Sequence, residues 1–194
     1  MKVYELVEIF ESLQGEGRNT GRPCAFIRFA GCNLKCPWCD TDAQRKFSAS
    51  LDEILKELKQ YRAKSVILTG GEPTLVKEMP ELVAALKKAG YWIGVETNGT
   101  IAADWLGFAD YVACSPKHGA ELALAAADEV RIVAEDEATA AFCREVRGRI
   151  AATDYYISPC DRGGKIDFAT AKSVLSQLDG WSLSVQLHKL LGFR

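Results

Sequence analysis

Short apolar segments alternate with amphipathic helical segments along most of the chain, and this order limits the folds open to it. Apolar runs typical of buried strands occupy residues 25–29, 65–69, 92–96, 111–114, 129–133 and 155–157, and residues 182–187 close the series. Apolar positions at helical spacing occupy residues 50–61, 79–89, 137–146 and 168–178. Because strands separated by helices join through right-handed crossovers, the alternation predicts an α/β fold with a mostly parallel sheet.

The number of strand–helix units narrows this fold class further. About six units fall short of the eight of a closed TIM barrel, so we expect an open, partial TIM-like barrel. The helical segments are short, above all near residues 106–109, which predicts reduced helices on the barrel surface. Ser50 and Glu53 have the spacing of a helix capping box, and Gly90 is placed to end a helix. Because we find no internal repeat or long linker, residues 1–194 are expected to form one domain.

Composition and charge exclude several classes of function. The formal net charge of −2 gives the chain no overall basic field, so we expect no nucleic-acid partner. We find neither a secretory signal nor an apolar stretch long enough to span a bilayer, so we expect a cytoplasmic protein with no membrane partner. Seven cysteines, an odd number with three crowded together, do not form the pattern of a secreted disulfide framework. A metal site in a reducing compartment fits them better.

Cys32, Cys36 and Cys39 supply three thiolates within eight residues. A closed tetrahedral metal site or a cubane cluster uses four such ligands. A four-iron cluster bound by three cysteines keeps one iron free for a substrate or cofactor, so the spacing predicts reactive chemistry. The alternative is a structural zinc site whose fourth ligand is Cys24, Cys160 or a histidine. Outside the motif we treat three cysteines as buried apolar residues, namely Cys24, Cys114 and Cys143.

Polar or glycine-rich turns follow four of the predicted strands, at the end where a parallel α/β fold places its ligand. Glycine lets the backbone approach a ligand closely, and exposed N–H and C=O groups in such turns bind the charged ends of an amino acid. A single turn of this kind is common in loops, but four at the same edge of a sheet predict a binding site. The turns are Thr69-Gly70-Gly71-Glu72-Pro73, Glu96-Thr97-Asn98-Gly99, Ser115-Pro116-Lys117 and Ser158-Pro159-Cys160-Asp161.

The cysteine motif and the first of these turns together resemble the radical S-adenosylmethionine (SAM) superfamily. The resemblance is carried by the Cys-x3-Cys-x2-Cys spacing, by Trp38 before the last cysteine, and by the Gly-Gly-Glu-Pro turn. Further motifs are similar to one family, the 7-carboxy-7-deazaguanine synthases of queuosine and deazapurine biosynthesis, and the resemblance extends to residue 192. These motifs are Gln14-Gly15-Glu16-Gly17, Gly21-Arg22-Pro23, Phe26-Ile27-Arg28, Gly31-Cys32-Asn33 and Trp38-Cys39-Asp40-Thr41.

For the cofactors, the resemblance implies a radical SAM fold that holds a [4Fe-4S] cluster on the three cysteines, with SAM chelated to the free iron. The backbone of Gly71 and the carboxylate of Glu72 would meet the SAM amino group. The resemblance also implies Mg²⁺ bound by the hydroxyl of Thr41, since a hard cation prefers oxygen ligands. The other residues implied in cofactor binding are Trp38, Asp40, Glu96, Ser115, Pro116, Lys117, Ser158, Pro159, Cys160 and Asp161.

For the reaction, the resemblance implies a lyase that converts 6-carboxy-5,6,7,8-tetrahydropterin to 7-carboxy-7-deazaguanine. Glu16 would accept from the pterin N–H edge, Gln14 would donate and accept, and Arg28 would pair with the carboxylate. The implied reaction abstracts the hydrogen at C6, contracts the ring and releases ammonia, and no residue is assigned as an acid or base. The other implied substrate contacts are Gly15, Thr69, His188 and the terminal carboxylate of Arg194.

Two further expectations concern partners, and two alternative functions are left open. The short helices predict that a second copy covers part of the barrel, so we expect a homodimer, and the resemblance implies an electron donor such as flavodoxin or ferredoxin. A glycyl-radical-enzyme activase would use the same cysteines without needing Gln14, Glu16 and Arg28. A non-catalytic iron–sulfur or zinc module would act as a sensor or electron carrier. Turnover of the pterin and metal analysis separate these functions.

Overall fold

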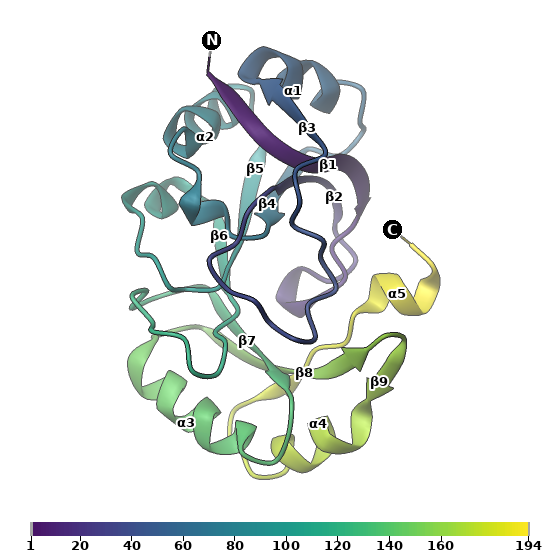
Figure 1. Ribbon diagram of the computed structural model, residues 1–194, viewed down its shortest axis with the longest axis vertical. Helices are drawn as coiled ribbons and strands as arrows, with labels where there is room; N and C mark the ends of the chain where they lie inside the picture. The colour runs from purple at the N-terminus through teal and green to yellow at the C-terminus, as the bar shows by residue number, and fades with distance from the viewer. Residues whose placement is uncertain (1, 194) are drawn as a thin grey trace.

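The computed structural model describes residues 2–193, which form an open ten-stranded sheet (Figure 1). The strand order is β10-β8-β7-β6-β5-β4-β2-β1-β3, with β9 paired to β8. The strands are β1 (Val3–Leu13), β2 (Pro23–Phe29), β3 (Phe47–Ser50), β4 (Ser65–Gly70), β5 (Trp92–Thr97), β6 (Tyr111–Cys114), β7 (Glu129–Ala134), β8 (Asp154–Arg162), β9 (Lys165–Asp167) and β10 (Ser182–Leu183). The α-helices are α1 (Leu51–Leu58), α2 (Met79–Lys88), α3 (Thr139–Arg149), α4 (Phe168–Leu175) and α5 (Leu187–Leu191), and the 3₁₀ helices are η1 (Gly17–Asn19), η2 (Pro73–Leu75) and η3 (Asp104–Phe108).

The central strands run parallel, as the alternation of strands and helices predicts. Each neighbouring pair from β2 to β10 in this order is parallel. Since β10 and β3 form the two edges of the order, the barrel is open, and the predicted partial TIM-like barrel is confirmed.

The first strand, β1, lies outside the predicted elements. It pairs antiparallel with β2 through residues 6–13 and with β3 through residues 3–6. Tyr4 and Leu6 are buried, whereas Val3 and Glu5, which alternate with them, are exposed. This period of two is the signal in the sequence that indicates the strand. β1 and β3 extend the parallel sheet at the side of β2.

The predicted helix signals are present, although some boundaries differ. Ser50 and Glu53 form the capping box of α1, in which the Glu53 N–H donates to Ser50 Oγ over 3.4 Å and the Ser50 N–H donates to Glu53 Oε2 over 2.7 Å. Gly90, with φ of 81°, follows α2. Of residues 182–187 only Ser182 and Leu183 pair with β8. None of the helices in residues 2–193 has the length and apolar character needed to cross a membrane.

Two of the crossovers carry less than a full α-helix, which confirms the predicted reduction. Between β5 and β6 the chain forms only η3, and residues 115–128 between β6 and β7 form no helix. α1 and α2 pack an apolar core against β2, β4 and β5, while α3 and α4 pack a second core against β7 and β8. Figure 1 shows the two helix pairs at opposite ends of the molecule, with the dark-blue loop between β2 and β3 crossing the space between them.

Candidate active site

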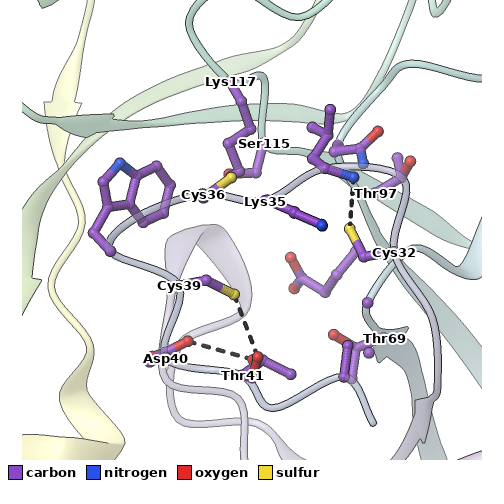
Figure 2. Close-up of a pocket in the computed structure, with 17 residues that line it drawn as sticks. Cys32, Lys35, Cys36, Cys39, Asp40, Thr41, Thr69, Thr97, Ser115 and Lys117 are labelled. Carbon is purple, nitrogen blue, oxygen red and sulfur yellow. Dashed lines mark hydrogen bonds between the residues drawn. The ribbon is translucent and has the colours of Figure 1, made fainter.

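A cavity of about 310 Å³ opens where the parallel strands end. Three of the four predicted turns form part of its wall, and the loop between β2 and β3 forms much of the rest (Figure 2). All three cysteines of the motif line it. The lining residues are Cys32, Leu34, Lys35, Cys36, Trp38, Cys39, Asp40, Thr41, Ala43, Thr69, Gly70, Gly71, Glu96, Thr97, Asn98, Ser115 and Lys117.

The glycine turn after β4 packs directly on the cysteine loop. The Gly31 N–H donates to the Ala43 carbonyl over 2.8 Å at the base of the loop, and the Glu72 N–H donates to the Gly31 carbonyl over 2.9 Å. A Cβ at position 71 would lie 1.9 Å from the Gly31 oxygen, so the approach requires glycine at this point. The Gly70-Gly71 pair therefore fixes where the cysteine loop lies above the sheet.

The thiols of the motif fit a cluster better than a single ion. Figure 2 shows the sulfur atoms of Cys32, Cys36 and Cys39 directed into the same cavity. A cubane binds its cysteines through separate irons, so thiols spread around a cavity suit it. In residues 2–193 no three His, Cys, Asp or Glu side chains are gathered closely enough to share one metal ion. Burial raises the pKa of the Cys36 thiol, and the nearby charge of Lys117 opposes that rise.

Lys117 and Ser115 lie together on the wall opposite the glycine turn. Lys117 Nζ donates to Ser115 Oγ over 2.5 Å and lies 5.0 Å from the ring centre of Trp38. Burial lowers the pKa of Lys117, while the nearby thiols oppose this change. A cation beside Cys36 favours the thiolate that a metal ligand requires. The structure thus brings together three of the residues predicted for cofactor binding.

Glu72 lies behind the cavity wall, where it joins two turns. Its Oε1 accepts from the Thr74 N–H over 3.0 Å, from the Thr74 hydroxyl over 2.7 Å and from the Thr97 hydroxyl over 2.8 Å. Its Oε2 accepts from the Asn98 N–H over 2.7 Å. These bonds tie the turn after β4 to the turn after β5. A contact between Glu72 and the SAM amino group stays a prediction.

Arg28 and Thr41 share one edge of the site. Arg28 Nη1 lies 3.3 Å from Thr41 Oγ1, and Arg28 Nε donates to Glu8 Oε1 over 2.8 Å. The pair with Glu8 holds the guanidinium in place, because an Arg–carboxylate contact is directional. The two residues assigned to the substrate carboxylate and to Mg²⁺ are therefore neighbours.

Arg131 is the main site residue that the sequence interpretation omits. Its guanidinium on β7 forms ion pairs with Glu16, with Glu96 and with Glu129. Gln14 Nε2 also donates to Glu96 Oε1, over 2.8 Å. The sequence carries a signal for this role, because the charged residues Glu129 and Arg131 stand within the apolar strand at residues 129–133. Charged side chains in a buried strand are rare unless they are paired.

The short helix α5 lies over the loop that holds Gln14 and Glu16. The Leu187 N–H donates to the Gly15 carbonyl over 2.9 Å. A Cβ at position 15 would lie 1.8 Å from His188 Nδ1, so glycine leaves the space that the His188 ring occupies. Burial lowers the pKa of His188, which favours the neutral ring at pH 7. His188 and Gly15, both predicted for the substrate, are in direct proximity.

Comparison with known proteins identifies the family. Residues 26–134 match the Radical SAM superfamily. The 7-carboxy-7-deazaguanine synthase of Haemophilus influenzae is 42% identical over 200 residues, which cover 97% of this chain and 93% of the relative. The chain belongs to the 7-carboxy-7-deazaguanine synthase family. The enzyme of the same name from Neisseria meningitidis serogroup B is 43% identical over 201 residues, with the same two coverages.

A solved structure agrees with this assignment. QueE from Escherichia coli aligns with a TM-score of 0.80 at 25% identity, over 96% of this chain and 95% of that one. The resemblance stated from the motifs is therefore confirmed. Membership in the radical SAM superfamily implies a [4Fe-4S] cluster and SAM as the cofactors of this family member.

Part of the predicted site differs in the structure. Residues 158–161 were expected to form a turn, which is wrong, because β8 continues through them to Arg162 and pairs with both β7 and β9. Ser158, Pro159 and Cys160 are buried in that strand, and Pro116 is buried as well. A direct role for these residues in cofactor binding stays a prediction. Arg194 lies outside the described residues, so its contact with substrate stays a prediction too.

Lys189 links α5 to the cysteine loop and to β8. Its Nζ lies 2.7 Å from Asp40 Oδ2 and 2.9 Å from Asp161 Oδ2. Burial alone would raise the pKa of Asp40, but the hydrogen bond and charge of Lys189 outweigh it and the pKa lies below its ordinary value. Lys189 likewise lowers the pKa of Asp161. Lys189 thus joins three segments that are distant in sequence.

Replacing Lys189 with methionine is expected to loosen α5. The amide hydrogens of residues 187–191 should exchange several-fold faster, in keeping with a partly exposed ion pair. Because the pKa values of both aspartates are depressed in the folded state, the stabilisation is complete above their ordinary value of 3.8 and is lost as the pH falls below it. The difference in protection factors should therefore shrink at acid pH. Lys172→Met, an exposed position on α4, serves as the control, and equal protection in both variants at neutral pH would contradict the expectation.

Proposed function

We propose that the chain converts 6-carboxy-5,6,7,8-tetrahydropterin to 7-carboxy-7-deazaguanine with loss of ammonia, as a radical SAM lyase. The observation that carries the proposal is one cavity lined by all three motif cysteines, with a residue proposed to contact substrate, Thr69, in the same wall. Relatives that match almost the whole chain have the name of this activity. Neither a glycyl-radical activase nor a non-catalytic module is favoured by that match.

The protein's own contribution is to orient the reactants and exclude water. When bound, the cluster and SAM supply radical chemistry that side chains cannot perform. Cys32, Cys36 and Cys39 would hold the cluster, and the exposed backbone at Gly71 would face the bound cofactor. α5, held by the Leu187 N–H, would cover the pterin and limit the access of solvent.

On the substrate side, the positive charge of Arg28 suits the carboxylate of the pterin. Arg28 would pair with that carboxylate, and we propose that the neighbouring Thr41 hydroxyl binds a Mg²⁺ ion shared with it. Gln14 and Glu16 would receive the N–H edge of the ring, with Glu16 held by Arg131.

Anaerobic turnover tests the proposed function. Reconstituted protein, SAM, Mg²⁺ and a chemical reductant are incubated with the pterin, and the deazaguanine is detected by mass spectrometry. Formation of the product, together with about four irons per chain, is expected. Stoichiometric zinc in anaerobically prepared protein, or cleavage of SAM only in the presence of a protein substrate, would count against it.

Replacing Thr41 with alanine is expected to weaken the response to Mg²⁺. Loss of the hydroxyl removes a proposed metal ligand, so the Mg²⁺ concentration for half-maximal turnover should rise about tenfold or more, the loss typical of removing even an outer-shell partner. Turnover is measured across a Mg²⁺ titration. Thr153→Ala, at an exposed position just before β8, is the matched control. An unchanged Mg²⁺ response in the Thr41 variant would remove Thr41 from the metal site.

We also propose that residues 1–194 act as one domain that forms a homodimer in the cytoplasm and takes its electron from a flavodoxin or ferredoxin. The continuous sheet supports a single domain. The thin cover over β5 and β6, and the 68% exposure of Phe108 beside it, support a second copy packed on this side. Light scattering at micromolar concentration should give twice the chain mass of 21.3 kDa, and a monomer would contradict the dimer.

A further inference from the structure

One buried cation joins three carboxylates from separate parts of the fold. Arg131 is only 4% exposed. Its Nη1 lies 2.9 Å from Glu16 Oε2, its Nε lies 3.1 Å from Glu129 Oε1, and its Nη2 donates to Glu96 Oε2. Only the contact with Glu96 has the geometry of a hydrogen bond, whereas Nε and Nη1 are buried with no hydrogen-bond partner and hold Glu129 and Glu16 as ion pairs. A planar guanidinium surrounded in this way sets the positions of the carboxylates relative to one another. Through Glu16 and Glu96, Arg131 connects the loop after β1 to the end of β5.

Glu129 differs from the other two carboxylates because its own contacts fix it. The Tyr111 hydroxyl donates to Glu129 Oε2 over 2.6 Å, and the Arg18 N–H donates to the same atom over 2.9 Å. A Cβ at Gly17, where φ is 63°, would lie 2.1 Å from Glu129 Oε1, so the loop after β1 packs closely on this carboxylate. Glu129 is thus an anchor that places the guanidinium of Arg131.

The remaining two carboxylates are partly exposed, and one of them, Glu96, lines the cavity. The side chains of Glu16 and Glu96 are each 22% exposed, compared with 2% for Glu129. Glu96 lines the cysteine cavity and also accepts from Gln14. A carboxylate has about four acceptor positions, so both retain acceptor capacity for a ligand. Three carboxylates around one guanidinium leave an excess of negative charge, which suits a ligand edge made of N–H donors.

We infer that Arg131 is a positioning residue for substrate recognition, which aligns Glu16 and Glu96 as paired acceptors between the cofactor cavity and the substrate. The inference rests on the proposed function and assigns to this strand residue a part in it. Arg131 acts through the two carboxylates and does not itself touch the pterin. Its loss therefore weakens ground-state binding, which raises KM while kcat changes little.

Arg131→Lys tests the inference, because lysine keeps the charge but presents no planar fork. Binding of 6-carboxytetrahydropterin is measured anaerobically by calorimetry, and KM and kcat are measured on the reconstituted enzyme. We expect Kd and KM to rise about 10- to 100-fold, the effect of one hydrogen bond to a charged group, with kcat within about threefold. Arg147→Lys is the matched control: its Nη1 donates to the Asp179 carbonyl over 2.6 Å, away from the cavity, and its Kd should equal that of the wild type.

A double-mutant cycle separates positioning from a general structural effect. If Arg131 acts through Glu16, the Arg131→Lys, Glu16→Gln double variant should bind no more weakly than the weaker single variant. Additive losses, or an unchanged Kd in Arg131→Lys, would overturn the inference. If thermal melting shows that Arg131→Lys does not fold, the cycle of Glu16→Gln with Glu96→Gln replaces it. The shared guanidinium then predicts non-additive losses, and additive ones overturn the inference.

Different results would contradict the proposed function and the positioning role of Arg131. If the wild-type protein neither binds nor converts the pterin, the proposed function is wrong. If the wild type converts it and Arg131→Lys matches the wild type in Kd and KM, only the assignment of Arg131 is wrong.

Discussion

Replacing Cys36 with alanine is expected to remove turnover and the bound cluster together. Cys36 lines the same cavity as Cys32 and Cys39, and two thiolates alone do not replace the three that this motif supplies. Loss of a partner outside the ligand shell of a metal site costs about 10- to 100-fold, so loss of a ligand should exceed that range. Iron content, the visible absorption of the reconstituted protein and the rate of deazaguanine formation are measured in parallel.

Cys143→Ala is the matched control for this change. Cys143 is buried in α3, within the core that packs against β7 and β8, and lies outside the residues that line the cavity. Its replacement removes a small apolar group and should lower the free energy of unfolding by about 1 kcal/mol while iron content stays the same. Wild-type turnover in Cys36→Ala would show that this thiol is not a ligand. Stoichiometric zinc in the wild type would favour the structural site instead.

The parallel strands were predictable because each has a local signal. The apolar runs at β4 and β6 are short and bounded by turn residues, and that of β4 is rich in β-branched residues. Both strands form within a residue or two of the predicted ends. The end of β8 was not predictable in this way. Ser158-Pro159 is typical of a turn, but the pairing of these residues with Val133 and Ala134 keeps the strand extended. Tertiary pairing here overrides local preference.

The site was predictable in its residue types and less so in its contacts. The motif indicated the cysteines, and the resemblance assigned Arg28 to the substrate carboxylate and Thr41 to Mg²⁺. Only the structure shows that these two residues are neighbours. Arg131 and Lys189 were missed because their partners lie far away in sequence, 115 residues away for the Arg131–Glu16 pair and 149 for the Lys189–Asp40 pair. The charges within the apolar strand indicate that Arg131 needs partners, but no periodicity or spacing indicates which residues they are. Only the fold brings these charges together.

Replacing Glu72 with glutamine is expected to destabilise the protein even when no cofactor is bound. The carboxylate accepts four hydrogen bonds, and an amide would turn an N–H₂ group toward donors on Thr74, Thr97 or Asn98. Glu72 is only 1% exposed, so water cannot compensate. Loss of hydrogen bonds to a buried charged group should lower the free energy of unfolding by about 3 kcal/mol, which corresponds to a fall in Tm of about 6 to 12 °C.

The stability of the cofactor-free protein separates two interpretations of Glu72. If the residue mainly joins the turns after β4 and β5, Tm of the apo-protein falls, and SAM affinity falls with it because Gly71 is no longer held against the cysteine loop. If the residue acts mainly by contact with the SAM amino group, Tm is unchanged and only SAM affinity falls. The hydrogen bonds within the chain favour the first outcome. Glu121→Gln, at an exposed position in the loop between β6 and β7, should leave both quantities at their wild-type values.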